Sequence, residues 1–177
     1  MPITEHQLLQ ILPNAGRNAG VFVPVLNAAM GKYGIVTRLS IAAFIAQVGH
    51  ESGQLRYVRE IWGSTAQQVG YEGRADLGNT VKGDGSKYRG RGLVQITGRA
   101  NYADCGEALT LNLIDKPELL ELPRHAAMSA AWFWSTKGLN TLADQEDFTK
   151  ITRRINGGLN GLEDRLQLWE RAKKVLA

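Results

Sequence analysis

Apolar residues recur at the spacing of an α-helix along most of this chain, and the pattern predicts a mainly α-helical protein. Prolines, glycines and hydroxyl residues mark where the periodic segments begin and end. The expected helices cover residues 4–12, 19–33, 101–109, 123–138, 147–155 and 162–176, together with one that begins at 37 or 40 and ends near 53. Residues 54–62 are expected to be helical or turn-like, and Pro117 to begin a short helical turn.

Two segments in the middle break this pattern. Glycines accumulate across residues 63–87, which are predicted to form a long surface loop of the kind that often carries function. Residues 88–97 are a short β-like run, in which Leu93–Ile96 is expected to supply one strand of a small hairpin. Because no repeat or linker divides the chain, residues 1–177 are expected to form a single domain.

The apolar faces also predict which side chains are buried. On the last helix, Leu162, Leu166, Trp169 and Val175 are expected to point inward. The consecutive aromatic residues Trp132–Trp134 must spread over more than one face, so we expect most of them in the core and one in a cleft.

Charge and composition narrow the class of protein. The 21 lysines and arginines against 17 aspartates and glutamates give a formal charge of +4, which suits an anionic partner such as a bacterial envelope or a nucleic acid, or an ordinary solvated surface. The single cysteine, Cys105, excludes an intramolecular disulfide and favours synthesis in a reducing compartment. The first residues lack the features of a signal peptide, and no run is apolar enough to cross a bilayer, so we expect no stable membrane insertion.

Glu51 occupies an unusual position for a carboxylate. Counting back at helical spacing gives Val48, Gln47 and Phe44, so Glu51 lies on or beside the buried stripe of its helix. Gly53 is a stop signal, which puts Glu51 in the last turn, where the helix dipole disfavours an anion. Both effects favour the neutral carboxyl that a general acid requires. A helix-end glutamate paired with an arginine explains the position equally well.

Metal chemistry is not favoured by the sequence. His50-Glu51 resembles the start of a zinc-protease helix, but that motif needs a second histidine at position 54, where this chain has Gln54. His6 and His125 are isolated and lie at no metal-ligand spacing. We therefore expect no metal.

Phosphate binding and covalent catalysis are also disfavoured. Gly83–Lys87 has its lysine and serine in the wrong order for a phosphate-binding loop. No Gly-x-Ser-x-Gly motif is present, and Cys105 has no obvious base partner. We expect no cofactor.

A pair of carboxylates remains as the candidate chemistry. Glu51 and Glu60 would be roughly 13 Å apart on one straight helix, but Gly53 lets the chain turn back and shorten the gap. An inverting glycosidase needs its two carboxyls about 6.5–9.5 Å apart. Arg56 and Arg59 would keep Glu60 ionised, so that the two acids differ in protonation. The competing interpretation is an ordinary surface ion pair between Arg56 and Glu60.

Three blocks of sequence resemble the family 19 glycoside hydrolases, which include chitinases and the lysozyme-like endolysins of bacteriophages. The blocks are residues 44–53 (FIAQVGHESG), residues 88–97 (YRGRGLVQIT) followed by Asn101-Tyr102, and residues 155–158 (INGG). They fall in the order of the family, and the resemblance runs from about Val21 to the C-terminus.

The resemblance implies roles for individual residues. It makes Glu51 the general acid, Glu60 the base that activates water, and Thr97 the hydroxyl that helps to hold that water. The positions implied to contact substrate or to form its site are His50, Tyr88, Gln95, Asn101, Asn156 and Arg165, the last of which resembles an arginine that pairs with the region of the acid. Judged alone, Gln95 and Thr97 are ordinary strand residues and Asn156 is a helix cap.

The chain departs from the plant chitinases of the family in two ways. Its segment between the two acids is shorter, and Ala100 stands where those enzymes have an aromatic residue. The spacing is closer to the phage endolysins, and it leaves Glu72 as a rival for the base.

The resemblance implies a lysozyme-like two-lobed α fold with a small β-hairpin region. It implies that the protein is an endolysin, which hydrolyses the β-1,4 bonds of peptidoglycan with inversion at the anomeric carbon and thereby lyses the host cell. Such an endolysin is expected to be a monomer, made in the host cytoplasm and released to the wall by a separate holin-type partner. The alternatives are a chitinase acting on N-acetylglucosamine polymers and a non-catalytic wall-binding module. A nucleic-acid binder that uses Lys87, Arg89, Arg91 and Arg99 is disfavoured, because few aromatic residues lie between these basic residues.

Overall fold

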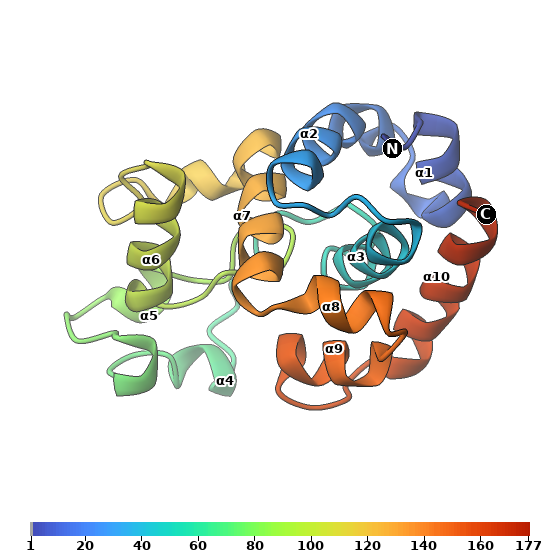
Figure 1. Cartoon of the computed structure of the whole chain (residues 1–177). Coiled ribbons are helices and arrows are strands. Elements are labelled where there is room, and N and C mark those ends of the chain that lie inside the picture. Colours follow the sequence, from blue (N-terminus) through green and yellow to red (C-terminus); the bar gives the residue numbers. More distant parts are fainter. Residues whose placement is uncertain (1) are drawn as a thin grey trace.

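The computed structural model describes residues 2–177, and within them nearly all regular structure is helical (Figure 1). The α-helices are α1 (Glu5–Ile11), α2 (Asn18–Lys32), α3 (Arg38–Glu51), α4 (Ala66–Val69), α5 (Asp84–Lys87), α6 (Arg99–Leu109), α7 (Pro123–Thr136), α8 (Leu139–Asp144), α9 (Phe148–Asn156) and α10 (Leu162–Val175). Three short 3₁₀ helices complete the list: η1 (Pro13–Ala15), η2 (Ala75–Leu77) and η3 (Pro117–Glu121).

The helix ends follow from local chemistry. Thr4 and Thr37 each close a capping box, in which the threonine hydroxyl accepts a hydrogen bond from a backbone N–H three residues later. Pro123 is the first residue of α7, where its missing N–H costs nothing, and the Asp147 side chain caps α9. Gly157 ends α9 with φ +79°, a conformation that favours glycine. The helix positions expected from these residues are confirmed.

Helix α3 forms the centre of the larger lobe. Every residue from Ser40 to Gly49 is buried, so the helix is surrounded by protein on all sides. It packs against α10 and α8. Gly49 allows α1 to approach closely, because a Cβ at this position would lie 2.5 Å from the Cδ2 atom of Leu12. Glu51 thus ends a helix that is fixed along its whole length.

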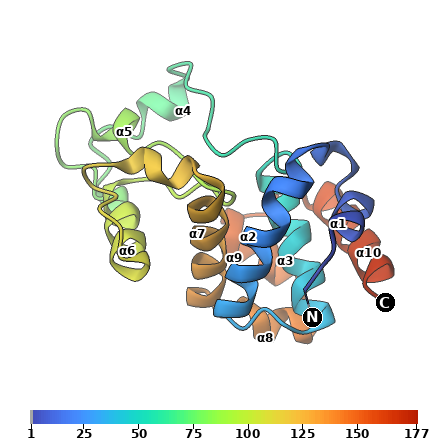
Figure 2. The same ribbon diagram turned by 90° about the horizontal axis from the view of Figure 1, so that it is seen from above.

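The structure has two apolar clusters, and α7 contributes to both. The larger cluster joins α1, α2, α3, α8, α9 and α10 to one face of α7, with Trp134 against Phe44. The smaller cluster contains Tyr88, Tyr102 and Cys105, and Trp132 packs against it. Figures 1 and 2 show α4, α5 and α6 on one side of α7, and α1, α3 and α10 on the other. The expected mainly α, two-lobed fold is confirmed.

The expected β-hairpin is reduced to two isolated bridges among the described residues, Arg59 with Arg91 and Arg91 with Ile96. Residues 92–95 form a tight turn instead of a strand, with Gly92 at φ +81° and Gln95 at φ +61°. The apolar run Leu93–Ile96 was misread as a strand because its burial comes from packing in a turn and not from pairing.

The chain reverses direction directly after α3. Gly53, Gln54 and Leu55 all have positive φ, at +58°, +61° and +67°. This conformation is unfavourable for Gln54 and Leu55 and is held in place by the surrounding packing. Residues 54–62 therefore form a turn followed by extended chain, and the helical alternative for this segment is wrong.

Other expectations are corrected by packing. Residues 63–87 contain α4, η2 and α5 and bury the polar residues Gln68, Asn79 and Asp84, so the segment is more than a surface loop. Helix α8 was not predicted. The four side chains of α10 expected to point inward do face the core: Trp169 is buried in the larger cluster, and Leu162, Leu166 and Val175 pack against it partly buried. Arg165, Leu168 and Ala172 are buried as well. No helix in residues 2–177 is long and apolar enough to span a membrane.

Candidate active site

Glu51 is anchored by a hydrogen-bonded network that starts in the core. Its Oε1 atom lies 2.7 Å from Nη2 of Arg165 on α10. The same guanidinium donates from Nη1 to Oε1 of Gln47 at 2.6 Å and from Nε to the carbonyl of Asn160 at 3.0 Å. Gln47 in turn donates to the hydroxyl of Thr152 on α9 at 2.9 Å. Three helices thereby fix one carboxylate.

The Arg165 side chain is 1% exposed and that of Glu51 is 18% exposed. The pair is therefore a largely buried, charge-assisted contact. Of the two interpretations of Glu51 from sequence, the structure contains the arginine pair. The buried Arg165 cannot reach a ligand, so it positions Glu51 and does not bind substrate.

His50 precedes Glu51 and belongs to the same helix end. Its Nδ1 atom lies 2.7 Å from Oδ2 of Asp164. Gly161 makes room for the ring, because a Cβ there would lie 2.3 Å from the His50 Cε1 atom. The imidazole is therefore wedged between α3 and the start of α10, with its side chain still 26% exposed.

Glu60 is held in the extended segment after the turn. Its Oε1 atom accepts a hydrogen bond of 2.7 Å from the N–H of Gly90, and its own N–H donates to the Gly90 carbonyl at 2.9 Å. Gln68 on α4 donates to Oε2 at 3.3 Å, and Tyr71 lies close enough to Glu60 to be affected by its charge. Burial and the negative charge of Glu60 raise the pKa of Tyr71, so its hydroxyl stays protonated as a donor.

The arginines expected to lie beside Glu60 are engaged elsewhere. Arg56 donates from Nε to the carbonyl of Gly53 at 2.8 Å, and Arg59 lies 3.6 Å from Glu121. The proposed Arg56–Glu60 ion pair is therefore absent from the described residues, because the segment is extended and not helical. Neutral donors hold Glu60 in its place.

Glu72 has a local structural role. Its carboxylate accepts hydrogen bonds from the N–H groups of Gly83 and Gly85, at 3.1 and 3.4 Å. These contacts fix the loop that leads into α5. The geometry therefore favours Glu60 over Glu72 as the second carboxylate.

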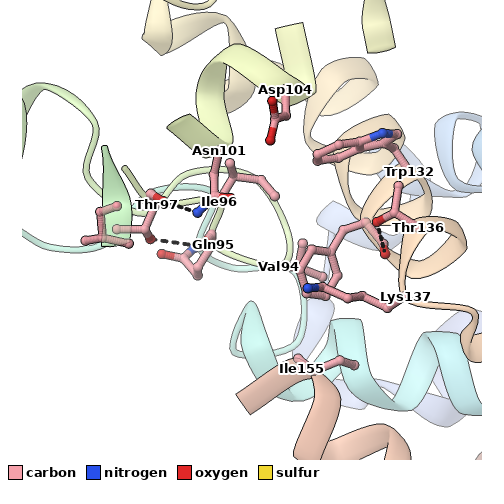
Figure 3. A pocket seen from close by; sticks show the side chains of 12 residues that line it. Val94, Gln95, Ile96, Thr97, Asn101, Asp104, Trp132, Thr136, Lys137 and Ile155 are labelled. Atoms are coloured by element: carbon pink, nitrogen blue, oxygen red, sulfur yellow. Dashed lines mark hydrogen bonds between the residues drawn. The ribbon is translucent and has the colours of Figure 1, made fainter. Parts of the chain in front are cut away.

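A cavity of about 520 Å³ lies between the two lobes, with Gln95, Thr97 and Asn101 in its wall (Figure 3), and neither Glu51 nor Glu60 is among its lining residues. Gly90 connects Glu60 to this wall, since a Cβ at Gly90 would lie 2.6 Å from Oε1 of Gln95 and 3.3 Å from the Thr97 hydroxyl. Thr97 donates to the Gln95 carbonyl at 2.9 Å, and Asn101 donates to the Thr97 carbonyl at 2.8 Å. The structure therefore brings these three predicted residues together.

The opposite wall of the cavity comes from α7 and α9, and sequence reasoning identified little of it. Figure 3 shows Trp132, Thr136 and Lys137 on one side, Asp104 from α6 above them and Ile155 below. Two residues of the Trp132–Trp134 run, Trp132 and Phe133, line this cavity, where only one was expected, and Trp134 is buried in the core. Asp104 and Lys137 gave no signal in the sequence, because isolated charged residues are usually solvated.

Tyr88 and Asn156 lie outside this cluster. Tyr88 is completely buried, and its hydroxyl donates to the carbonyl of Ile114 at 2.7 Å, so its prediction as a substrate contact is wrong. Asn156 is exposed at the end of α9, where its side chain accepts a hydrogen bond from the N–H of Asn160 at 3.2 Å. The hydrogen bond of Asn156 therefore fits the structural role of a residue at the end of a helix.

The sequence and fold were compared with those of known proteins. Residues 19–145 match the family model described as chitinase class I of the family 19 glycoside hydrolases. This chain belongs to that family. A family 19 domain-containing protein of Haemophilus influenzae is 33% identical, over 96% of this chain and 94% of its own length. The basic endochitinase CHB4 of Brassica napus is 35% identical over 69% of this chain, which spans only 44% of the plant protein.

Solved structures of the family share the fold. A bacterial family 19 chitinase superimposes with a TM-score of 0.79 and 26% identity, covering 100% of this chain and 96% of that one. Chitinase C from Streptomyces griseus gives 0.80 and 26% identity, covering 98% and 92%. Members of the family are glycosidases, so this family 19 protein is assigned to the glycoside-hydrolysing enzymes.

The match to the family 19 model covers only part of the site described above. It includes both glutamates and the cavity wall from Val94 to Lys137. It ends before Asn156 and Arg165, which lie on α9 and α10. The anchor of Glu51 in this family 19 chain is therefore contributed by helices beyond the matched residues.

Proposed function

We propose that this family 19 enzyme hydrolyses the β-1,4 glycosidic bonds of bacterial peptidoglycan with inversion, using Glu51 as general acid and Glu60 as general base. The observation that carries the proposal is the different anchoring of the two carboxylates. Arg165 ties Glu51 to the larger lobe, whereas Gly90 and Gln68 tie Glu60 to the smaller one. Two acids on opposite lobes suit the positions of proton donor and water activator.

In the proposed reaction, Glu51 gives its proton to the glycosidic oxygen as the bond to the anomeric carbon breaks. Glu60 accepts a proton from a water molecule, whose oxygen attacks the anomeric carbon from the opposite face and inverts its configuration. A glycan that covers Glu51 excludes bulk water from the carboxyl during this step.

Side chains of the cavity fit the remaining tasks. The Thr97 hydroxyl is separated from Glu60 only by Gly90, which suits a group that helps to hold the attacking water. Gln95 and Asn101 offer amides that can hydrogen-bond the N-acetyl groups of the sugars. His50 and Asn156 lie at the ends of α3 and α9, and their contribution to glycan binding stays a prediction.

The peptidoglycan assignment is supported by the short segment between the two glutamates and by the basic net charge, which favours approach to an anionic wall. We propose that the enzyme acts as a monomeric endolysin that reaches the wall from the host cytoplasm through a separate holin-type partner. In contrast, nucleic-acid binding is poorly supported, because Arg91 and Arg99 are engaged by Glu121 and Asp84 within the chain.

A chitinase acting on N-acetylglucosamine polymers is the second candidate. It is favoured by the similarity to the Brassica endochitinase and to the two bacterial chitinase structures. Both substrates present β-1,4-linked N-acetylated sugars, so the shared site does not distinguish them.

Product analysis separates the two candidates. The purified enzyme is incubated with peptidoglycan and with colloidal chitin, and the new reducing ends are reduced and identified by mass spectrometry. Release of muramic acid or glucosamine ends from peptidoglycan, with little release from chitin, supports the proposal. Faster release from chitin assigns the enzyme as a chitinase, and release from neither contradicts both.

A further inference from the structure

A second hollow is lined by residues on both sides of Glu60 in the chain and is not used in the proposed reaction. It is a cavity of about 450 Å³ with three arginines in its wall, Arg56, Arg59 and Arg89. Its remaining wall is made by Tyr57, Val58, Ile61, Trp62 and Glu121. Arg59 and Ile61 are the chain neighbours of Glu60, so this hollow borders the proposed catalytic base.

The positive charge of this arginine pocket is not balanced within the described chain. Glu121 is its one carboxylate, and that group is already shared between Arg91 at 2.9 Å and Arg59 at 3.6 Å. Neither Arg56 nor Arg89 forms an ion pair with any acid among residues 2–177. The pocket therefore has an excess of positive charge that an anionic ligand would neutralise.

Aromatic rings orient two of these guanidinium groups. Arg89 lies 4.9 Å from the centre of the Trp62 ring, and Arg56 lies 5.7 Å from that of Tyr57. Arg89 donates from Nε and Nη2 to Ser86, and Arg56 donates from Nε to the Gly53 carbonyl, so the remaining N–H groups of both guanidiniums are those that can meet carboxylate oxygens. The pocket is thus suited to a carboxylate more than to a single point charge.

The rim of the pocket is apolar and accessible. Ile61 is 78% exposed and Tyr57 is 47% exposed. Small alkyl groups of a ligand could cover these side chains while its carboxylates face the arginines. The ligand indicated by the pocket is therefore an acidic peptide with small apolar residues.

We propose that the arginine pocket binds the carboxylates of the short peptide stem carried by the glycan strand whose bond lies at Glu60. The inference rests on the proposed function, because peptidoglycan carries acidic stems on alternate sugars and chitin carries none. Binding the stem beside the base would make the enzyme prefer stem-bearing strands. Specificity for the wall would then come from outside the sugar-binding cavity.

The first test compares two forms of one substrate, glycan strands with intact stems and the same strands after an amidase has removed the stems. For each, kcat/KM is measured from reducing ends. The ratio of kcat/KM for stem-bearing strands to kcat/KM for stem-free strands is expected to fall about fivefold in R56Q and further in R56E. K174Q, which removes an exposed charge from α10, should leave the ratio unchanged.

An unchanged ratio in R56Q and R56E overturns the inference while leaving the proposed function intact. If the wild-type enzyme cleaves neither substrate, the proposed function fails instead. The pocket is then still tested by calorimetric titration of the acidic stem tripeptide into the wild-type protein. Binding that weakens at least fivefold in R56Q supports the inference, and absence of binding to the wild type overturns it.

A third measurement distinguishes the class of anion. Duplex DNA of random sequence is offered to the wild type and to R56Q at low salt. Retardation of DNA by the wild type that is lost in R56Q, without any tripeptide binding, would overturn the inference by assigning the arginine pocket to nucleic acid. Tripeptide binding without DNA retardation supports the stem as its ligand.

Discussion

The two glutamates of this enzyme are supported in opposite ways. Glu51 ends a buried helix and is fixed by an arginine that is itself almost inaccessible to water. Glu60 lies in extended chain, and a backbone N–H and the neutral side chain of Gln68 hold its carboxylate. One carboxylate depends on charge within the core, and the other on hydrogen bonds from the smaller lobe.

This difference predicts that the two glutamates differ in how easily they can move. The larger lobe packs α3 against α10, so Glu51 can move only if the core moves. The support of Glu60 comes from a segment with short helices and many turns, in which local opening is easier. We therefore expect changes around Glu51 to affect stability and activity together, and changes around Glu60 to affect mainly activity.

The largest expected effect follows from removing either proton-transfer group. E51Q and E60Q keep the size of the side chain and should each lower kcat about 10³-fold, because general acid–base catalysis contributes about 10²–10⁴-fold. Both variants should still bind peptidoglycan in a pull-down assay. Lysis at the wild-type rate by E51Q would mean that Glu51 is not the acid.

E72Q is the matched control for this prediction. Glu72 hydrogen-bonds only backbone groups of its own loop, so its replacement should leave kcat within about twofold of the wild type. A loss in E72Q as large as that in E60Q would exchange the roles of the two residues.

The next largest effect is expected at the buried arginine. R165M leaves Glu51 and Gln47 without their shared donor, so the free energy of unfolding should fall by about 3 kcal/mol, as for a broken buried ion pair. R171M, on the same helix, loses one hydrogen bond to the carbonyl of Ile11 and should lose about 1 kcal/mol. Urea unfolding measures both values. Equal losses of unfolding free energy in R165M and R171M would show that the Arg165 network contributes no more than a single hydrogen bond.

A smaller and pH-dependent effect is expected in the lobe of Glu60. Asp84 is buried and accepts two hydrogen bonds from Arg99, at 2.8 and 2.9 Å, which hold the pKa of its carboxyl below the ordinary value of 3.8. The stability from this pair is complete above that value and disappears as the pH falls through the lowered pKa. D84N should therefore be less stable than the wild type at pH 7 by about 2 kcal/mol.

The difference between D84N and the wild type should shrink below about pH 4, because the wild-type carboxyl then takes up its proton. Thermal unfolding followed from pH 2 to pH 7 measures this change. A difference that stays constant down to pH 2 would show that the ion pair is not its source.

The smallest effect is expected at the hydroxyl beside Glu60. Y71F removes a protonated hydroxyl close to the Glu60 carboxylate, so kcat/KM should fall about threefold. The free energy of unfolding should change little. Y33F, at the end of α2, serves as the control and should keep the wild-type kcat/KM.

Several features of the molecule were predictable because they depend on neighbouring residues in the chain. Thr4, Thr37 and Pro123 begin helices through contacts within one turn, so their positions were found from sequence. Family membership was predictable for a related reason, since the three blocks of residues 44–53, 88–97 and 155–158 keep their order and spacing.

The errors arose where distant contacts decide the outcome. Residues 92–95 are apolar enough for a strand, but their burial against α7 gives a turn. Tyr88 was predicted to contact substrate because of its place in a sequence block, yet the smaller apolar cluster covers it completely. Polar residues of 63–87 were expected in water and are instead buried with partners.

The sequence by itself determined most of the longer helices and the family, and it led to the hypothesis of the two glutamates, because these depend on local periodicity and on short blocks of residues. The resemblance implied that Arg165 pairs with the region of Glu51, but only the tertiary structure decided the other contacts of the two glutamates. Arg165 reaches Glu51 across 114 positions of the chain, and Gly90 reaches Glu60 across 30. Such partners are selected by packing of whole helices and turns, which no local pattern of apolar and polar residues encodes.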